Sequence, residues 1–216
     1  MKPLAWAAGL TLALTPLSAV ADSTTFTIFR KGDAIGEHRI DVTEDGDRTI
    51  AVTEIEMKVK FGPIPLFKYR HDSTEVWVAG ALQSVESDTN DNGKKKTLRL
   101  TRGETAFQVE GTEYSGEAPL AAIPSSYWNK AILEAPVLID TQDGELIELD
   151  ITSLGDQPAP LAAGGEIIAE KYELRGSVSL DLWYKDADWV GAAFTVRGED
   201  LKYALQADPA AIAATE

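Results

Sequence analysis

The feature that most limits the fold is an alternation of apolar and polar residues that recurs along the chain from Thr24 onward. Runs such as TTFTIFR, TEVWVAG, KTLRLTR and TAFQVEG place an apolar residue at every second position or nearly so. Because side chains of a strand point alternately to the two faces of a sheet, this period of two predicts half-buried strands. Turn-forming segments such as EDGD, NDNG and QDGE separate the runs and favour tight hairpins. We therefore predict an all-β protein, a single curved antiparallel meander or open barrel.

One of these turns, DTNDNG at residues 88–93, also matches the first half of an EF-hand calcium loop. The twelfth position of such a loop requires a bidentate Glu, and Arg99 occupies it here. The flanking segments alternate like strands, whereas an EF-hand requires helices. We predict a hairpin turn at Asn92-Gly93 and no calcium site.

The run TIAVTEIEMKVKF changes phase along its length. Ile50 and Val52 belong to one phase, and Ile55 and Met57 belong to the other. This change predicts a β-bulge near Thr53. The prolines of the following GPIP segment are expected to end the pairing, because proline cannot donate to a sheet.

One region lacks the alternation, and it spans residues 114–136. Two prolines interrupt it, and SSYWNKAIL can start a short helix capped by Ser125 or Ser126. We expect a short helical or loop segment near 120–133 that acts as a plug or lid. Residues 22–207 form a single β-domain in this interpretation, and residues 208–216 form a flexible tail.

The first 21 residues have the pattern of a secretory signal. Lys2 precedes an apolar run from Leu4 to Leu17, and Ala19-Val20-Ala21 forms the cleavage motif. The run is about 14 residues long, which is short of the roughly 20 that span a bilayer. The chain has no cysteine, which excludes disulfides, thiolate metal sites and N-terminal lipidation. We expect cleavage after Ala21 and a location in the bacterial periplasm.

The formal net charge of −15 argues against two classes of partner. Nucleic acids and anionic membrane surfaces both require a basic footprint. Acidity also keeps proteins soluble, which is its commonest role. We expect no nucleic-acid partner and no transmembrane segment after residue 21.

No motif of a known enzyme class is present: there is no nucleophile elbow, phosphate-binding loop, dinucleotide fingerprint or zinc-protease motif. The two histidines, His38 and His71, are in phase with bulky apolar residues. With Asp72 or Glu75 they define one alternative, a metal-assisted hydrolase. Two histidines are a small ligand set, because catalytic zinc usually has three protein ligands, and a core histidine with a hydrogen bond is more common. We expect no catalytic activity and no cofactor.

The aromatic residues suggest a pocket. Trp77 and Trp183 lie in runs that are apolar on both faces, as in strands that are covered or line a cavity. Core packing is the simplest interpretation, but a barrel of this size can also enclose an apolar ligand. The predicted ligand-binding residues are His38, Phe67, Tyr69, His71, Trp77, Tyr127, Trp128, Asn129 and Trp183.

Four segments in their order resemble a known family: IFRKGDAIGEHRIDV, STEVWVAGALQSVESDTNDNGKKKTL, IPSSYWNKAIL and LWYKDADWVGAAFTVRGEDLKYAL. They resemble the DUF6134 family of uncharacterised exported proteobacterial proteins and, more distantly, the DUF3108 family. The resemblance implies a curved antiparallel sheet or open barrel, similar in outline to periplasmic lipoprotein carriers, with no established activity. The family-like positions are Gly32, Gly36, His38, Glu75, Trp77, Gly80, Thr89, Gly93, Tyr127, Trp128, Asn129, Trp183, Tyr184, Gly198 and Tyr203.

Taken together, the sequence predicts a soluble periplasmic β-protein that binds or carries an apolar or lipid-like ligand, or serves an envelope process. Its partner is then a small hydrophobic molecule or an envelope protein. The metal-assisted hydrolase is one alternative. The other is an envelope scaffold, which would have a filled core and an exposed apolar patch.

Overall fold

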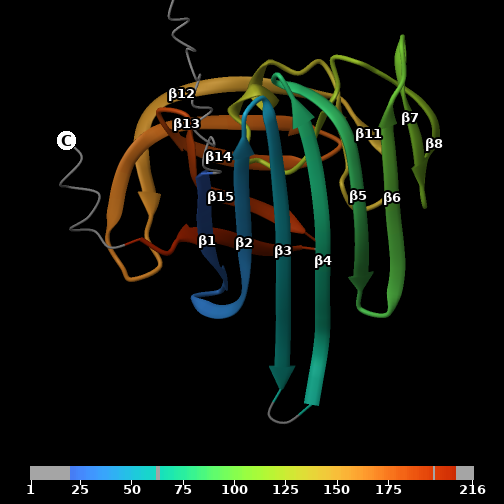
Figure 1. Ribbon diagram of the computed structural model, residues 1–216. Helices are drawn as coiled ribbons and strands as arrows, with labels where there is room; N and C mark the ends of the chain where they lie inside the picture. Colours follow the sequence, from blue (N-terminus) through green and yellow to red (C-terminus); the bar gives the residue numbers. More distant parts are fainter. Residues whose placement is uncertain (1–19, 62–63, 197, 208–216) are drawn as a thin grey trace, which may run out of the picture.

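The computed structural model describes residues 20–61, 64–196 and 198–207, and they form a large antiparallel sheet of thirteen strands (Figure 1). Consecutive strands pair along the chain, and β16 pairs with β1, so β12 and β8 are the two edges and the sheet stays open. The first eight strands are Val20–Arg30, Asp33–Asp45, Arg48–Phe61, Ile64–Val78, Ala81–Asp91, Lys94–Arg102, Ala106–Gly111 and Ser115–Pro119 (β1–β8). The last five are Leu149–Pro160, Glu166–Gly176, Ser179–Lys185, Asp188–Val196 and Glu199–Leu205 (β12–β16). The predicted all-β fold, an open antiparallel meander, is confirmed.

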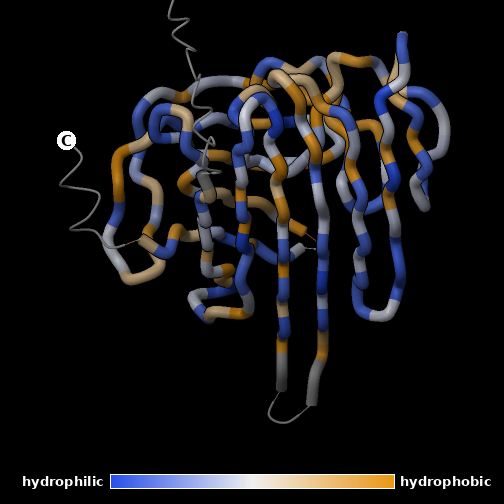
Figure 2. The backbone as a smooth tube through the Cα atoms, viewed as in Figure 1, coloured by the Kyte–Doolittle hydropathy of each residue, from blue (hydrophilic) through white to orange (hydrophobic). Residues whose placement is uncertain are grey.

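The alternation of the sequence becomes an inner and an outer face of this sheet. Figure 2 shows hydrophobic and hydrophilic residues alternating along β2, β3 and β4. In β2, His38 and Ile40 are buried, while Glu37 and Arg39 are exposed. The sheet curls, so that β12–β15 pass behind β1–β4 and the inner faces of the two halves look toward each other (Figure 1). In the part of the chain that the structure describes, no helix has the length and apolar character needed to cross a membrane.

The turn at DTNDNG is a two-residue hairpin between β5 and β6, as predicted. Asn92 and Gly93 have φ angles of 52° and 96°. Positive φ at both central residues matches the twist of the flanking strands, and Asn-Gly adopts it at the lowest cost.

The predicted bulge near Thr53 is wrong. The pairing of β3 with both neighbours is continuous through this position, and its register shifts only between Val59 and Lys60. Ala51 and Thr53 face inward, and Val52 is exposed on the outer face. Gly62 and Pro63 lie outside the described residues. The prediction that the GPIP segment ends the pairing does not hold for Ile64 and Pro65, which begin β4 and pair with β3.

The segment between β8 and β12 forms the plug. It contains a small sheet of Ile123–Pro124, Leu138–Ile139 and Leu146–Ile147 (β9–β11) and one 3₁₀ turn, Lys130–Glu134 (η1). The plug lies at the end of the molecule away from the β3–β4 hairpin (Figure 1). The predicted cap at Ser125 or Ser126 is wrong, because Asn129 is the N-cap and its side chain accepts from the backbone N–H of Ala131 at 3.0 Å.

The plug divides the core. One apolar cluster packs the plug against β1–β3 and β13–β16, and a second packs it against β4–β7. A third cluster lies on the other face of β14 and β15, where β12 and β13 fold over it. Gly155, with a φ of 69°, lies in the irregular stretch of β12 between Ser153 and Asp156 that permits this fold. Trp183 belongs to this third cluster, on the face of its strand opposite to Leu182 and Tyr184.

Candidate functional site

A cavity of about 850 Å³ lies between the inner face of β2–β5, the plug and β13–β16. The front wall contributes His38, Ile55, Met57, Tyr69 and His71. The plug contributes residues 125–127 and 140–142, and the back wall contributes residues 176–180 and 194–203 in part. The cavity exists because the long-range packing of the plug fills only part of the space inside the curled sheet.

The lining of the cavity combines polar and apolar groups. The polar residues His38, Thr53, His71, Ser73, Ser126 and Tyr203 line it and are at most 6% exposed, next to the buried apolar residues Leu138, Leu180 and Leu201. The apolar residues Leu66, Val178 and Val196 line its opening and are 60%, 41% and 43% exposed, beside the exposed polar residues Ser177, Ser179 and Thr195. Apolar walls with a few polar groups at a defined place are the usual form of a small-molecule site.

The two histidines of the buried end are held as neutral imidazoles. Burial lowers the pKa of His38 to about 3, with a further decrease from the charge of His71. Burial lowers the pKa of His71 to about 4, against the opposing effect of Asp72. The Nδ1 atom of His71 lies 2.8 Å from the hydroxyl of Thr89. Neither ring nitrogen of His38 has a hydrogen-bond partner among the described residues, and its ring packs edge-on against Trp189 and Tyr203.

Three tyrosines and two carboxylates lie beside these histidines. Tyr69 is directly opposite Asp91 in the β4–β5 pair. Burial raises the pKa of Tyr69, and the charges of Tyr203, Asp140, Tyr127 and Asp91 raise it further. Burial raises the pKa of Asp140 to about 6, although the hydrogen bonds of Gln142 oppose the shift. The tyrosines are therefore neutral near pH 7, and Asp140 is the group that titrates close to it.

A further buried carboxylate, Glu75, joins the plug to the sheet. Its Oε2 accepts from the indole N–H of Trp77 at 2.9 Å and from that of Trp128 at 3.2 Å. Burial raises the pKa of Glu75, and hydrogen bonds from Ser126, Trp77 and Trp128 oppose this rise. Trp77 and Trp128 also pack edge to face, with ring centroids 6.0 Å apart. Trp77 and Trp128 were both predicted to bind a ligand, and in the structure their contact positions the plug.

The plug presents Tyr127 to the cavity in an uncommon conformation. Its φ is 66°, and a left-handed backbone is costly for a residue with a side chain. The Tyr184 hydroxyl donates to the Tyr127 carbonyl at 2.7 Å, while the neighbours of Tyr127 on both sides contact Glu75. The contacts on both sides hold the aromatic ring in the cavity wall.

Of the nine residues predicted to bind a ligand, the structure places five in the wall of the cavity: His38, Phe67, Tyr69, His71 and Tyr127. Trp77 and Trp128 lie behind the wall, at Glu75. Asn129 caps η1, and Trp183 lies in the third apolar cluster. The prediction did not include Thr53, Asp91, Asp140 or Tyr203. Of these, Tyr203 was detectable, because it is in phase with Leu201.

The carboxylates proposed for a metal site are not positioned for one. Asp72 is on the outer face of β4, where both of its carboxylate oxygens accept from Arg70 at 2.7 Å. Its proposed partnership with His71 is therefore wrong. Glu75 is held by the two indoles. Across the described residues, no group of three or more histidine, cysteine or acidic side chains can hold a metal ion.

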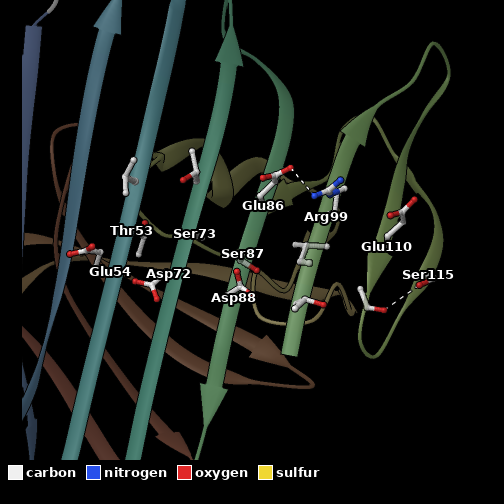
Figure 3. A pocket seen from close by; sticks show the side chains of 15 residues that line it. Thr53, Glu54, Asp72, Ser73, Glu86, Ser87, Asp88, Arg99, Glu110 and Ser115 are labelled. Carbon is white, nitrogen blue, oxygen red and sulfur yellow. Dashed lines mark hydrogen bonds and ion pairs between the residues drawn. The ribbon is translucent and has the colours of Figure 1, made fainter. Parts of the chain in front are cut away.

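A second, more open hollow of about 630 Å³ lies on the outer face of β3–β8. Figure 3 shows the side chains that line this hollow, among them Glu54, Asp72, Glu86, Asp88, Glu110 and Arg99. Arg99 forms an ion pair with Glu86 at 3.3 Å, and both side chains are about two-thirds exposed, at 65% and 66%. The hollow is a solvated acidic face, and such exposed pairs contribute little to stability.

Comparison with known proteins gives the fold and the family. A crystal structure described as a β-barrel-like protein of the domain of unknown function DUF1849, from Brucella abortus, has a TM-score of 0.58 to this chain. The similarity covers 85% of this chain and 94% of that chain at 8% sequence identity, so it concerns the fold alone. No curated protein matches the sequence. The model of DUF6134, a domain of unknown function, matches residues 26–206, and the chain therefore belongs to this family.

Proposed function

We propose that this protein binds and carries an amphipathic, lipid-like molecule in the periplasm. The observation that carries the proposal is the cavity, whose lining combines buried polar groups with apolar side chains that reach its opening. A volume of about 850 Å³ falls within the usual range of small-molecule sites, roughly 300–1,000 Å³. A ligand with one polar end and one apolar chain matches both parts.

The periplasmic part of the proposal depends on the N-terminal sequence. Residues 1–19 lie outside the described residues. Cleavage after Ala21 would leave Asp22, which pairs with Val42, at the start of β1. The core positions Phe26 and Ile28 would keep their place, so processing at this point is compatible with the fold.

The alternatives of the sequence receive less support. An envelope scaffold was expected to have a filled core, and a cavity of this size favours a binding role. A hydrolase needs a nucleophile or a metal-bound water next to an acid or base. Among the described residues, neither carboxylate proposed as a third ligand supports such a site, because Asp72 accepts from Arg70 on the outer face and Glu75 accepts from two indoles.

Native mass spectrometry of the protein purified from its own periplasm tests the proposal. Met57→Trp places a larger side chain in the cavity, whereas Val52→Trp places the same side chain on the outer face of the same strand. We expect an additional small-molecule mass on the wild type and on Val52→Trp, and its loss from Met57→Trp. Absence of any bound mass on the wild type, or equal amounts on both variants, would contradict the proposal.

A further inference from the structure

The charges that line the cavity indicate which polar group a ligand would bring. Among the described lining residues, Arg30 is the sole lysine or arginine. It lies at the mouth, where its guanidinium forms an ion pair with Glu199 at 2.7 Å. Asp91 and Asp140 line the cavity deeper in. An anionic head group beside them would meet two carboxylates of the cavity lining.

Asp140 lines the cavity and accepts hydrogen bonds from a neutral neighbour. It is the first residue after β10, and its Oδ1 accepts from the backbone N–H of Gln142 at 2.8 Å. Lys96 pairs with Asp143 at 2.5 Å, and its charge also acts on Asp140, whose pKa it lowers. The hydrogen bonds of Asp140 come from the neutral groups of Gln142. A buried carboxylate is costly unless a cation compensates it, and a cationic ligand would add to the effect of Lys96.

Aromatic rings surround the same position. Tyr69, Tyr127 and Tyr203 line the cavity together with Asp140. They lie near one another, because the charge of Asp140 raises the pKa of Tyr69 and of Tyr127, and the charge of Tyr203 also raises that of Tyr69. The faces of aromatic rings attract cations, and groups of such rings recognise ammonium ions in proteins. The neutral histidines add no opposing positive charge.

Unpartnered buried atoms provide a second, independent sign of a missing polar ligand. The hydroxyl of Thr53 and both ring nitrogens of His38 line the cavity, are buried, and have no hydrogen-bond partner among the described residues. Buried polar groups in native proteins are nearly always satisfied by protein, water or ligand. A neutral imidazole and a hydroxyl can both accept a hydrogen bond, directly or through water.

We propose that the cavity takes an amphipathic cation, with an ammonium group at Asp140 among Tyr69, Tyr127 and Tyr203 and an alkyl or acyl chain extending to Leu66, Val178 and Val196. This inference rests on the proposed binding function and specifies its ligand class. It excludes fatty acids and anionic phospholipids as the preferred ligands. Primary and quaternary ammonium groups share the chemistry that the site recognises.

The test compares probes that have the same chain and different head groups. Dodecyltrimethylammonium, dodecylamine, dodecyl maltoside and dodecanoate are titrated below their micelle concentrations into the purified, delipidated protein, and binding is followed by calorimetry. We expect at least one of the two cations to bind at least about tenfold more tightly than dodecanoate. Equal or tighter binding of dodecanoate would overturn the inference and leave the binding function in place. Absence of binding by all four would overturn both.

Two pairs of variants locate the ammonium group. Asp140→Asn should weaken the binding of the tighter cation at least about tenfold and leave dodecyl maltoside unchanged, whereas Asp72→Asn, the same charge change on the outer face, should alter neither. Tyr69→Leu should weaken cation binding, and Tyr69→Phe should retain it. Thermal unfolding shows whether each variant is folded. Equal losses in Asp140→Asn and Asp72→Asn, or no loss in a folded Asp140→Asn, would overturn the inference.

Discussion

The carboxyl group of Asp140 shows how one residue links the stability of this protein to its proposed function. Its pKa is raised from 3.8 to about 6, first by burial and further by the charge of Asp143. A raised pKa means that the folded state holds the proton more tightly than the unfolded state. The fold therefore loses stability as the pH increases from about 4 to about 6. Residues kept at such a cost commonly serve a binding site.

Asp140→Asn should remove this cost. The amide keeps the oxygen that accepts from Gln142, but it carries no charge to desolvate. We expect the variant to be more stable than the wild type by up to about 3 kcal/mol near neutral pH, with the difference declining as the pH falls from about 6 to about 4. Urea unfolding at several pH values measures it. A variant that is less stable near neutral pH, or a difference that does not change with pH, would contradict the account of Asp140.

Several site residues on strands were predictable from the alternation, whereas Asp140 was not. His38, Tyr69 and His71 follow from the alternation, because phase alone assigns a strand residue to a face. Asp140 follows a two-residue strand and has no phase to use. Its place in the cavity depends on the next residue, Thr141. The hydroxyl of Ser87, in β5, donates to the Thr141 carbonyl at 2.5 Å. That contact spans 54 positions, and no local pattern reports it.

At the scale of the elements, one buried contact that joins the plug to the sheet is the carboxylate of Glu75. Glu75 accepts from Trp77 of its own strand and from Trp128 of the plug. Loss of its carboxylate would leave two buried indole N–H groups without partners, each at a cost of about 1–3 kcal/mol. The plug is therefore expected to loosen from the sheet when Glu75 is truncated.

Glu75→Ala should lower the free energy of unfolding by about 3 kcal/mol and weaken ligand binding. Glu75→Gln keeps an oxygen for both indoles and should be much closer to the wild type. Glu54→Ala, on the outer face of β3, is the control and should change stability by no more than about 0.5 kcal/mol. Urea unfolding and probe binding together measure these effects. If Glu75→Ala is as stable as Glu54→Ala, Glu75 does not hold the plug.

The face of β3 shows where local pattern fails at the scale of an element. Ile50 and Val52 are apolar, and a bulge near Thr53 was predicted because it would place them on the same inner face as Ile55 and Met57. The continuous register instead places Ala51 and Thr53 inside. The inner face needs small and polar residues there, because Thr53 lines the cavity. A strand that lines a cavity does not need an apolar residue at every inward position. The apolar character of a residue therefore does not predict which face of β3 it lies on.

At the scale of the whole molecule, the sheet is large enough to curl around a space that the plug fills only in part. The strands, their order and the open antiparallel arrangement follow from alternation and turn residues. The cavity does not, because its volume depends on how far the plug enters and on how β12 and β13 fold over β14 and β15. This cavity, with buried polar groups and with apolar side chains that reach its opening, is the property that the whole fold produces and on which the proposed function depends.

A crystal structure of the protein purified from its native source, without removal of bound molecules, tests this claim most directly. We predict continuous electron density in the cavity that begins beside Asp140 and runs between Met57 and Leu201 toward Leu66. Density for ordered water alone, or a plug that closes onto β3 and leaves no space, would contradict it.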